Sequence, residues 1–385
     1  MAWSGHQLFL AGLLVFTGSI NTLATKWADM AVVSGSPYGH LKNGSSTTIP
    51  HPFSHSFLQA LGMFFGEFIC LVTFKVLLYL YSSRLRDSPE ASKMPSILNG
   101  NRNFNPYIFI PPVLCDMIGT TVMYIGLNMT YASSAQMLRG AVIIFTGLLS
   151  ILLLRRRLFC FQWTGILIVL AGLTIVGCAD MFFGSKKHIG NTPDAAGVTT
   201  GDLLIIAAQL ITALQMVLEE KFIVGHNVPP LQVVGLEGFF GMIGMILLLI
   251  PLYFIKVGGV PIEDTVDGIY QIYNSYQVAI GYFGTVLSIS FYNFAGVSVT
   301  KELSATTRMV LDSLRAIFIW VFCLFAQWQN FTVLTIIGFA IMLIGMMLYN
   351  NVLIMPFLVS HGCVADPFTE ENEEDRQQLA DEENP

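Results

Sequence analysis

The chain has 385 residues, of which 54% are hydrophobic and only 11% are charged, and its formal net charge is −6. Soluble domains are typically about 25% charged, so the composition argues against a soluble domain and favours membrane-spanning helices. Most of the negative charge lies in the C-terminal run EENEEDRQQLADEE, so the net charge supports neither nucleic acid binding nor any other class of partner.

Apolar runs of about 20 residues, separated by polar breaks, follow one another along the chain and predict transmembrane helices. The ten predicted spans are 6–26, 56–81, 106–128, 132–154, 160–180, 201–222, 231–255, 276–298, 303–326 and 331–353. The runs are continuous rather than alternating, which disfavours a β-barrel, and the first lacks the basic start of a signal peptide. The predicted fold class is an all-α polytopic membrane protein, followed by an acidic, disordered tail over 354–385.

The distribution of Lys and Arg predicts the orientation of the chain in the membrane. The loops after the second and fourth spans are rich in basic residues, as in the run RRR at 155–157, and the loop after the sixth span begins at Lys221. These loops and both termini are therefore predicted to be cytosolic, although Lys186 and Lys187 after the fifth span weaken the bias. This orientation places Asn43, in the sequon NGS, in the first lumenal loop as a candidate glycosylation site. The alternative is a chance match, because such sequons are common.

The two halves of the sequence resemble each other. The matching stretches, in the same order in both halves, are 7–27 with 202–222, 58–66 with 231–241, 126–130 with 296–300, 133–138 with 305–310, and Gly165 and Gly172 with Gly338 and Gly345. Because each half, 1–180 and 201–353, holds five spans, the second half enters the membrane from the opposite side. The predicted domains are therefore two inverted five-helix repeats, and their interface near the midplane is expected to hold a substrate.

Glycines recur along one face of the seventh span, at positions 235, 238, 241 and 244. Small residues at this spacing predict a close approach of two helices in a membrane. The alternative is that glycine is simply frequent in membrane helices.

The ninth span keeps three ionisable residues, Arg308, Asp312 and Arg315, at helical spacing on one face. Each charge at a helix centre costs about 2.5–3.5 kcal/mol on insertion scales, so these residues are expected to have a function. One aspartate cannot cancel two arginines, and the planar fork of arginine suits phosphate or carboxylate, so the face favours an anionic ligand. The alternative is a buried ion network that locks helices together.

Further polar residues in the spans are candidates for substrate binding. In the fourth span, Gln136 and Arg139 belong to a polar stripe, and Arg139 is too deep for easy snorkelling. In the eighth span, Tyr292 and Asn293 offer a ring and an amide that could hold a base or a sugar, with routine helix packing as the alternative. Lys301 is expected to line a cavity entrance, and an ordinary loop charge is the alternative.

Carboxylates also occur in the middle of predicted spans. Glu67 in the second span is either a proton-coupling group or, as the preferred interpretation, a partner for one of the arginines. Asp116 in the third span and Asp312 are grouped with it as coupling or ion-pair residues. Glu219, Glu220 and Glu237 lie near span ends and are expected to face water.

Other kinds of chemistry find no support in the sequence. The seven histidines lie at span ends or in loops, and the six cysteines form no CxxC pair. No metal-ligand set, phosphate-binding loop or catalytic triad is recognisable. The sequence therefore predicts no enzyme and no cofactor or metal site.

With QMLRGAVIIFTG in the fourth span and SVTKELSATTRMVLDSLR around the ninth, the chain resembles the drug/metabolite transporter superfamily over residues 6–353. More narrowly it resembles solute carrier family 35, which includes nucleotide-sugar and phosphate translocators. GSINTLATKWAD, PYIFIPPVLCDM and QMVLEEKF resemble the F branch of that family. The resemblance implies EamA-like five-helix repeats, a transport function, and binding to the mitochondrial adenine nucleotide translocase.

Residue roles carry over from this resemblance only in part. Basic residues in the fourth and ninth spans of phosphate translocators hold the phosphate, and Arg139 and Arg315 stand at matching positions, whereas Leu314 departs from a neighbouring basic position. Some nucleotide-sugar transporters carry FYNN in a binding helix, where this chain has Phe294 in place of the last asparagine. These departures count against nucleotide-sugar specificity.

The sequence as a whole predicts a secondary transporter of a small organic anion, phosphorylated or nucleotide-like, that works by alternating access. Its expected partners are a small-molecule solute and the lipid bilayer, and homodimerisation is left open. The first alternative is a non-transporting scaffold that binds a mitochondrial carrier and influences membrane potential or cell survival. The second is an intramembrane receptor or chaperone.

The expected location rests on the tail, which approaches an acidic dileucine sorting signal at Asp375 and Leu379, although Ala380 replaces the second leucine. A lysosomal or Golgi membrane is preferred, and a mitochondrial membrane is the alternative.

Overall fold

The structure is a computed structural model that describes most of the chain. The described residues are 4–37, 47–87, 100–101, 104–129, 138–154, 159–183, 195–257, 260–303, 307–308, 311–312, 315, 318–319, 321–322, 325–326 and 333–349. Asn43, Gln136 and the 354–385 tail lie outside them.

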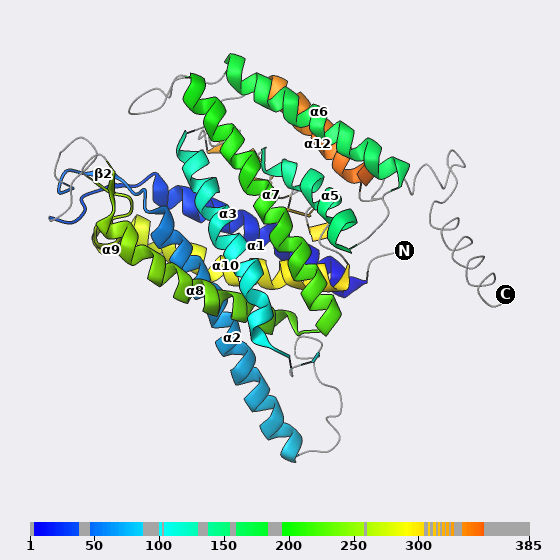
Figure 1. The fold of residues 1–385 in the computed structure, drawn as a ribbon. Helices are drawn as coiled ribbons and strands as arrows, with labels where there is room; N and C mark the ends of the chain where they lie inside the picture. Colours follow the sequence, from blue (N-terminus) through cyan, green and yellow to red (C-terminus); the bar gives the residue numbers. More distant parts are fainter. Residues whose placement is uncertain are drawn as a thin grey trace.

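Helices make up most of the described chain (Figure 1). In order they are α1 (Gly5–Asp29), α2 (Ser56–Asp87), η2 (Pro106–Phe109), α3 (Ile110–Met129), η3 (Arg139–Ala141), α5 (Val142–Leu154), α6 (Cys160–Phe183), α7 (Ala195–His226), α8 (Pro230–Phe254), α9 (Thr265–Asn274), α10 (Tyr276–Glu302) and α12 (Val333–Tyr349), where η denotes a short 3-10 helix. Apart from α9, each helix overlaps a predicted span. Of the predicted span 132–154 the structure describes 138–154, and of 303–326 it describes only isolated residues.

Six helices among the described residues are long and apolar enough to cross a membrane. They are Gly5–Asp29, Ser56–Tyr81, Pro106–Met123, Thr199–Ile223, Pro230–Phe254 and Tyr276–Glu302. Large apolar side chains on their outer faces are exposed, for example Phe9 by 64%, Leu287 by 63% and Phe254 by 73%. Apolar faces of this kind are stable in lipid rather than in water, so the prediction of a helical membrane protein is confirmed.

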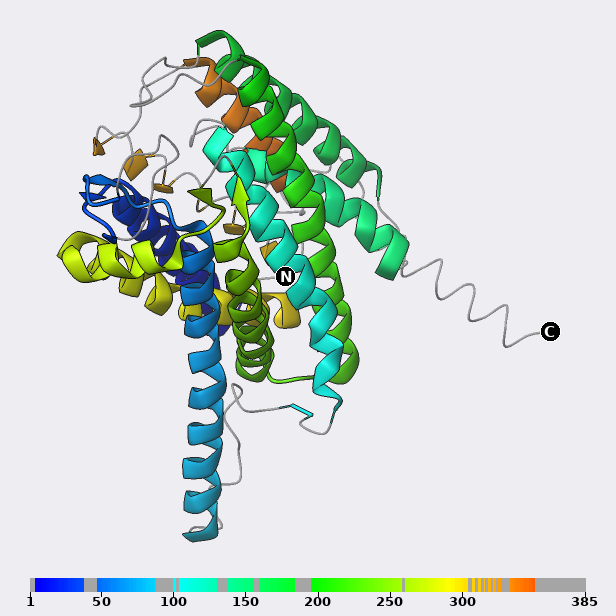
Figure 2. The same cartoon turned by 60° about the vertical axis from the view of Figure 1, so that its left-hand side comes forward.

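The long helices pack as pairs. Helix α1 lies along α10, α2 along α8, α3 along α7, and α6 along α12. Contacts of α10 with α2 and of α3 with α8 join the first three pairs into one bundle. The α6 and α12 pair lies at one side of the molecule, and α2 projects beyond the other helices (Figures 1 and 2).

Glycines allow two of these pairs to pack closely. A Cβ added at Gly235 or at Gly238 would collide with the backbone of Leu71 or of Phe68 on α2. Helix α8 therefore approaches α2 through its glycine face, as predicted. In the α6 and α12 pair, a Cβ at Gly172 would lie 2.7 Å from the carbonyl oxygen of Gly338.

The same pair has a second, equivalent contact. A Cβ at Gly165 would lie 2.8 Å from the carbonyl oxygen of Gly345, and a Cβ at Gly345 would lie 2.8 Å from that of Gly165. The four repeated glycines of the sequence thus meet crosswise, Gly165 on Gly345 and Gly172 on Gly338.

Small polar elements that the sequence analysis did not predict gather at one end of the bundle. Strands β1 (Val32–Val33) and β2 (His51–Pro52) form one antiparallel pair, and β3 (Lys256–Val257) and β4 (Val260–Pro261) form another. The short helix α9 follows, with Asp264 capping its start by accepting a hydrogen bond from the backbone N–H of Asp267. These elements lie where α1 and α8 end and where α2 and α10 begin (Figure 1).

Candidate functional site

Seven ionisable residues, five of them buried and two partly buried, form a charge cluster where several helices meet. Its carboxylates are Glu67 on α2, Asp116 on α3, Glu219 on α7, Glu237 on α8 and Asp312, and its guanidinium groups are Arg308 and Arg315. The contacts described below join residues from both halves of the sequence.

Arg308 forms the most deeply buried ion pair of the cluster. Its Nη1 donates to Oε2 of Glu219 at 2.8 Å, and the two side chains are 5% and 1% exposed. The other Glu219 oxygen accepts from the amide of Gln215 at 2.9 Å. The expectation that Glu219, Glu220 and Glu237 face water was therefore wrong, because all three are buried.

Arg315 has a different set of partners. Its Nη2 lies 3.5 Å from Oδ2 of Asp312, its Nη1 lies 3.4 Å from the carbonyl oxygen of Gly18, and its guanidinium stacks over the ring of Tyr292 at 4.9 Å. The Tyr292 hydroxyl in turn donates to Oδ1 of Asp312 at 2.6 Å. A cation over an aromatic face gains electrostatic attraction, so Tyr292 supports the guanidinium both directly and through Asp312.

Glu67 is held by an amide rather than by an arginine. Asn293 donates a short hydrogen bond to its Oε1. Electrostatic interactions also reach Glu67 from Asp116, Glu219 and Arg308. Glu67 was interpreted as the partner of an arginine, but it interacts with Arg308 only at longer range. Glu219 is the carboxylate that contacts Arg308 directly.

The ninth span alone offers one aspartate for two arginines, but in the cluster each arginine has its own carboxylate. Asp312 pairs with Arg315, while Arg308 takes its carboxylate from Glu219 on another helix. Both arginines nevertheless keep a buried Nε–H that has no hydrogen-bond partner. A sequence-based count along one helix could not include Glu219, because helix packing brings it there.

Two further predicted residues lie on η3 and α10. Arg139 is partly buried on η3, a turn that packs against α6 and α7. Lys301, at the end of α10, donates to the carbonyl oxygen of Val228 at 2.9 Å. With Ser298 and Glu302 it lines a small pocket.

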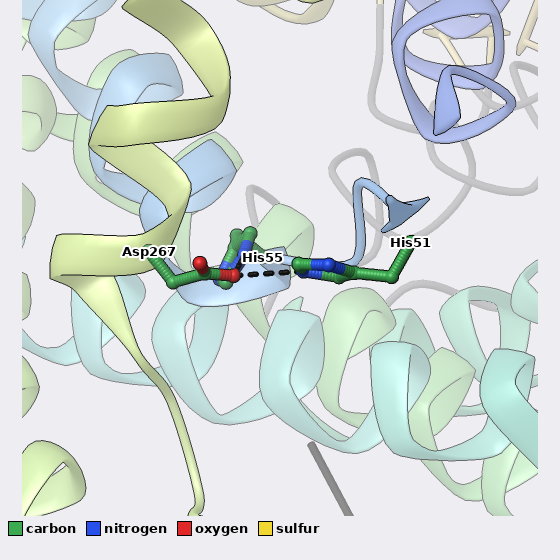
Figure 3. A group of neighbouring side chains, drawn as sticks. All are labelled: His51, His55 and Asp267. Carbon is green, nitrogen blue, oxygen red and sulfur yellow. Dashed lines mark hydrogen bonds and ion pairs between the residues drawn. The ribbon is translucent and has the colours of Figure 1, made fainter. Parts of the chain in front are cut away.

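A second polar cluster, which sequence reasoning missed, lies at the end of the bundle that carries the strands. His51, His55 and Asp267 point toward one another there (Figure 3). Nε2 of His51 and Nε2 of His55 lie 2.9 Å and 3.2 Å from the same oxygen, Oδ2 of Asp267. Sequence patterns could not reveal this cluster, because His51 and His55 precede Asp267 in the chain by 216 and 212 positions.

The electrostatics of this second cluster favour positive charge. Burial alone would lower the pKa of His55, but hydrogen bonds to Asp267 and Glu263 outweigh it and raise that pKa to about 9. Burial would raise the pKa of Asp267, yet hydrogen bonds from His55, the Ser36 N–H and His51 hold it below its usual value. The carboxylates therefore draw a cation, either a proton or a metal ion, onto the imidazole nitrogens.

Comparisons with a family model and with individual proteins both point to solute carrier family 35. A family model described as solute carrier family 35 matches residues 60–351. Proteins named solute carrier family 35 member F6, from Pongo abelii and Homo sapiens, are each 51% identical over 384 residues, covering 98% of this chain and 96% of theirs.

More distant similarities agree with this match. An uncharacterized protein of Schizosaccharomyces pombe is 29% identical over 357 residues, covering 92% of this chain and 100% of its own length. A solved structure titled only as a crystal structure of a protein superposes with a TM-score of 0.53 at 14% identity, over 90% of this chain and 97% of that one. This last similarity concerns the fold alone.

Proposed function

The chain belongs to solute carrier family 35, and from this premise we propose that it is a secondary transporter that moves a small organic anion by alternating access. The observation that carries the proposal is the pair of buried guanidinium groups, Arg308 and Arg315, each with an unpartnered Nε–H. A buried donor without a partner costs about 1–3 kcal/mol, which an incoming phosphate or carboxylate oxygen would relieve.

The proposed binding step is an exchange of partners. An anion that reaches the cluster competes with Asp312 for Arg315 and with Glu219 for Arg308. Arg139 and Arg315 are the proposed main anion-binding residues, with Arg308 and Lys301 assisting, and Tyr292 and Asn293 orient the rest of the solute. A phosphorylated or nucleotide-like solute suits this set because guanidinium groups bind phosphate oxygens in pairs.

Two inverted five-helix repeats, 1–180 and 201–353, are the proposed architecture, and the helix pairs support it. Exchanging the halves maps the first span onto the sixth and the third onto the eighth. In helix labels, α1 exchanges with α7 and α10 exchanges with α3, so the pair α1–α10 becomes the pair α7–α3. The pairs α2–α8 and α6–α12 each map onto themselves, because their two members exchange with each other. A two-fold relation between the halves predicts this set of pairs, and the crosswise glycine contacts of α6 and α12 fit it as well.

The orientation and location of the protein are part of the same proposal. Both termini lie in the cytosol, so the end of the bundle with His51, His55 and Asp267 faces the lumen or exterior. A lysosomal or Golgi membrane is the preferred location, and a mitochondrial membrane is the alternative.

Binding to the purified protein tests the proposal. UMP, UDP-glucose, inorganic phosphate and citrate are added separately, and thermal unfolding is followed in detergent. We expect at least one of these anions to raise the unfolding temperature of the native chain and of Lys256→Ala, which changes an exposed residue outside the spans. The same anion should leave Arg139→Ala unshifted, and an equal shift in Arg139→Ala would contradict the assigned role.

A non-transporting scaffold that binds the mitochondrial adenine nucleotide translocase is the second candidate. The paired state of Arg308 and Arg315 favours it, because such ion pairs also lock helices together. Cross-linking in mitochondrial membranes separates the two candidates. The scaffold predicts a cross-linked carrier that persists in Arg139→Ala, together with an absence of solute flux in reconstituted vesicles.

A further inference from the structure

The second polar cluster, His51, His55 and Asp267, has the composition and spacing of a metal site. One nitrogen or oxygen atom from each residue lies within 4.8 Å of the others. The side chains are 10%, 8% and 3% exposed, so the cluster is nearly closed. Zinc bonds to histidine nitrogen at about 2.0–2.1 Å, so tetrahedral ligands lie roughly 3.3 Å apart. The separations of 2.9 Å and 3.2 Å to Oδ2 need to change by only tenths of an ångström.

The outer nitrogens of both rings are already held in the way that metal-binding histidines are held. Nδ1 of His51 lies 3.1 Å from the carbonyl oxygen of Ile49, and Nδ1 of His55 lies 2.7 Å from Oε1 of Glu263. Both nitrogens therefore donate outward, to a carbonyl and to a carboxylate. This is the usual second-layer arrangement of zinc sites, and it leaves Nε2 of each ring to face the centre of the cluster.

The neighbouring amide of Gln271 packs against Nε2 of His51 and has a fixed orientation. Nε2 of Gln271 lies 3.0 Å from that histidine nitrogen, and the same amide nitrogen donates to the carbonyl oxygens of Val33 and His51 at 3.1 Å and 3.3 Å. Reversing the amide would bring its oxygen against both carbonyls, so the nitrogen must point this way.

Nε2 of His51 faces the Asp267 oxygen at 2.9 Å, a separation that either a proton or a metal ion can bridge. The opposite oxygen of Asp267 already accepts from the backbone N–H of Ser36 at 2.6 Å, which fixes the carboxylate in place. In addition, Oε1 of the fully buried Gln271 has no hydrogen-bond partner. The cluster thus brings two imidazole nitrogens and one carboxylate oxygen around one point.

We propose that His51, His55 and Asp267 bind one divalent transition-metal ion, with Zn²⁺ as the ion that best suits two imidazoles and a carboxylate. Three protein ligands leave a fourth position for water. The charge is balanced, because the two positive charges of the ion face the carboxylates of Asp267 and Glu263, and the ion displaces the proton from His55 so that both imidazoles are neutral in the bound state.

The ion joins segments far apart in the chain. His51 and His55 lie between α1 and α2, whereas Asp267 lies on α9, just before α10. A bound ion therefore links the first and second halves of the sequence at one end of the bundle. The metal site itself does not depend on whether the chain transports a solute.

Metal content and binding test the proposal on the full chain, purified with a tag that contains no histidine. We expect about one zinc per chain by plasma mass spectrometry, and after chelation a rise in unfolding temperature with Zn²⁺ but not with Mg²⁺. X-ray absorption should show nitrogen and oxygen neighbours without sulfur, which separates this cluster from adventitious binding at the free cysteines.

Variants locate the ion. His51→Ala, His55→Ala and Asp267→Asn should each lower zinc affinity by at least about tenfold, and Glu263→Gln, which changes only the outer partner of His55, by about 10–100-fold. His6→Ala is the control, because His6 lies at the opposite end of α1 and is about half exposed. His55→Cys keeps a zinc ligand and should restore binding, with sulfur now visible in the absorption spectrum.

Two outcomes would overturn the proposal. One is a folded, monodisperse native chain that neither contains nor binds zinc or another transition metal. The other is zinc binding that is equal in the native chain, His51→Ala and His55→Ala.

Discussion

Arg308 and Glu219 illustrate how a single charged pair persists inside an apolar bundle. The 2.8 Å contact between them excludes water almost entirely, since the two side chains are 5% and 1% exposed. Burial of two charges is expensive, and their attraction offsets that cost only while both are present. The pair is therefore sensitive to the loss of one member and tolerant of the loss of both.

Removing one member should destabilise the protein by about 3–5 kcal/mol, because the other charge is left buried without compensation. We expect this for Arg308→Met, measured by denaturant unfolding in detergent. The double variant Arg308→Met/Glu219→Met should recover most of the loss. A single variant as stable as the native chain would show that the pair opens to water.

Tyr292 offers a milder test of the neighbouring contacts. Tyr292→Phe removes the hydroxyl that donates to Asp312 at 2.6 Å and leaves a charged acceptor without this donor. Hydrogen bonds to charged groups contribute about 1.5–3 kcal/mol, so a loss of that order is expected in the unfolding free energy. Tyr273→Phe is the matched control, since Tyr273 is 89% exposed and should change little.

The sequence identified Arg308, Asp312 and Arg315 because charge in an apolar run is rare and helical spacing places them on one face. It could not identify their partners. Glu219 comes from α7, and Gly18 contributes a backbone oxygen from α1, so both contacts exist only after packing. For the same reason no pattern connected His51 with Asp267.

At the scale of elements, the close contact of α6 with α12 depends on residues that lack a side chain. Gly172→Ala would place a Cβ 2.7 Å from the Gly338 carbonyl oxygen and from the Met342 backbone nitrogen. Backbone atoms cannot move aside as a side chain can, so overpacking should cost about 1–3 kcal/mol.

The measurement for this prediction is thermal unfolding in detergent, with Gly12→Ala as the control. Gly12 has no heavy atom within 4 Å of an added Cβ, so alanine there should be neutral or slightly stabilising. If both variants unfold at the native temperature, the α6 and α12 contact contributes nothing to stability.

Long helices were predictable because each consists of an uninterrupted apolar run, and α1, α8 and α10 begin and end within a few residues of the predicted spans. The strand pairs and α9 were not predicted. Each strand covers two residues, which is too short for an alternating pattern. Helix α9 lies in a polar stretch whose structure depends on the loops that pack against it.

At the scale of the whole molecule, the proposed orientation puts the α8–α9 and α9–α10 connections on one side of the membrane and the α7–α8 turn on the other. In a chain without other cysteines, Asn274→Cys and His226→Cys report on these two sides, and both positions are exposed. An impermeant maleimide added to sealed, cytosol-side-out vesicles should label His226→Cys and spare Asn274→Cys until detergent is added. Equal labelling of both would contradict the orientation.

Exchange of solute across a sealed bilayer addresses the central claim most directly. Proteoliposomes loaded with UMP, UDP-glucose, inorganic phosphate or citrate are diluted into the same radiolabelled anion, and counterflow is recorded for the native chain, Arg139→Ala and Lys256→Ala. The account predicts saturable counterflow of at least one anion for the native chain and Lys256→Ala, and none above empty vesicles for folded Arg139→Ala. Undiminished counterflow in Arg139→Ala, or none in a folded native chain, would contradict it.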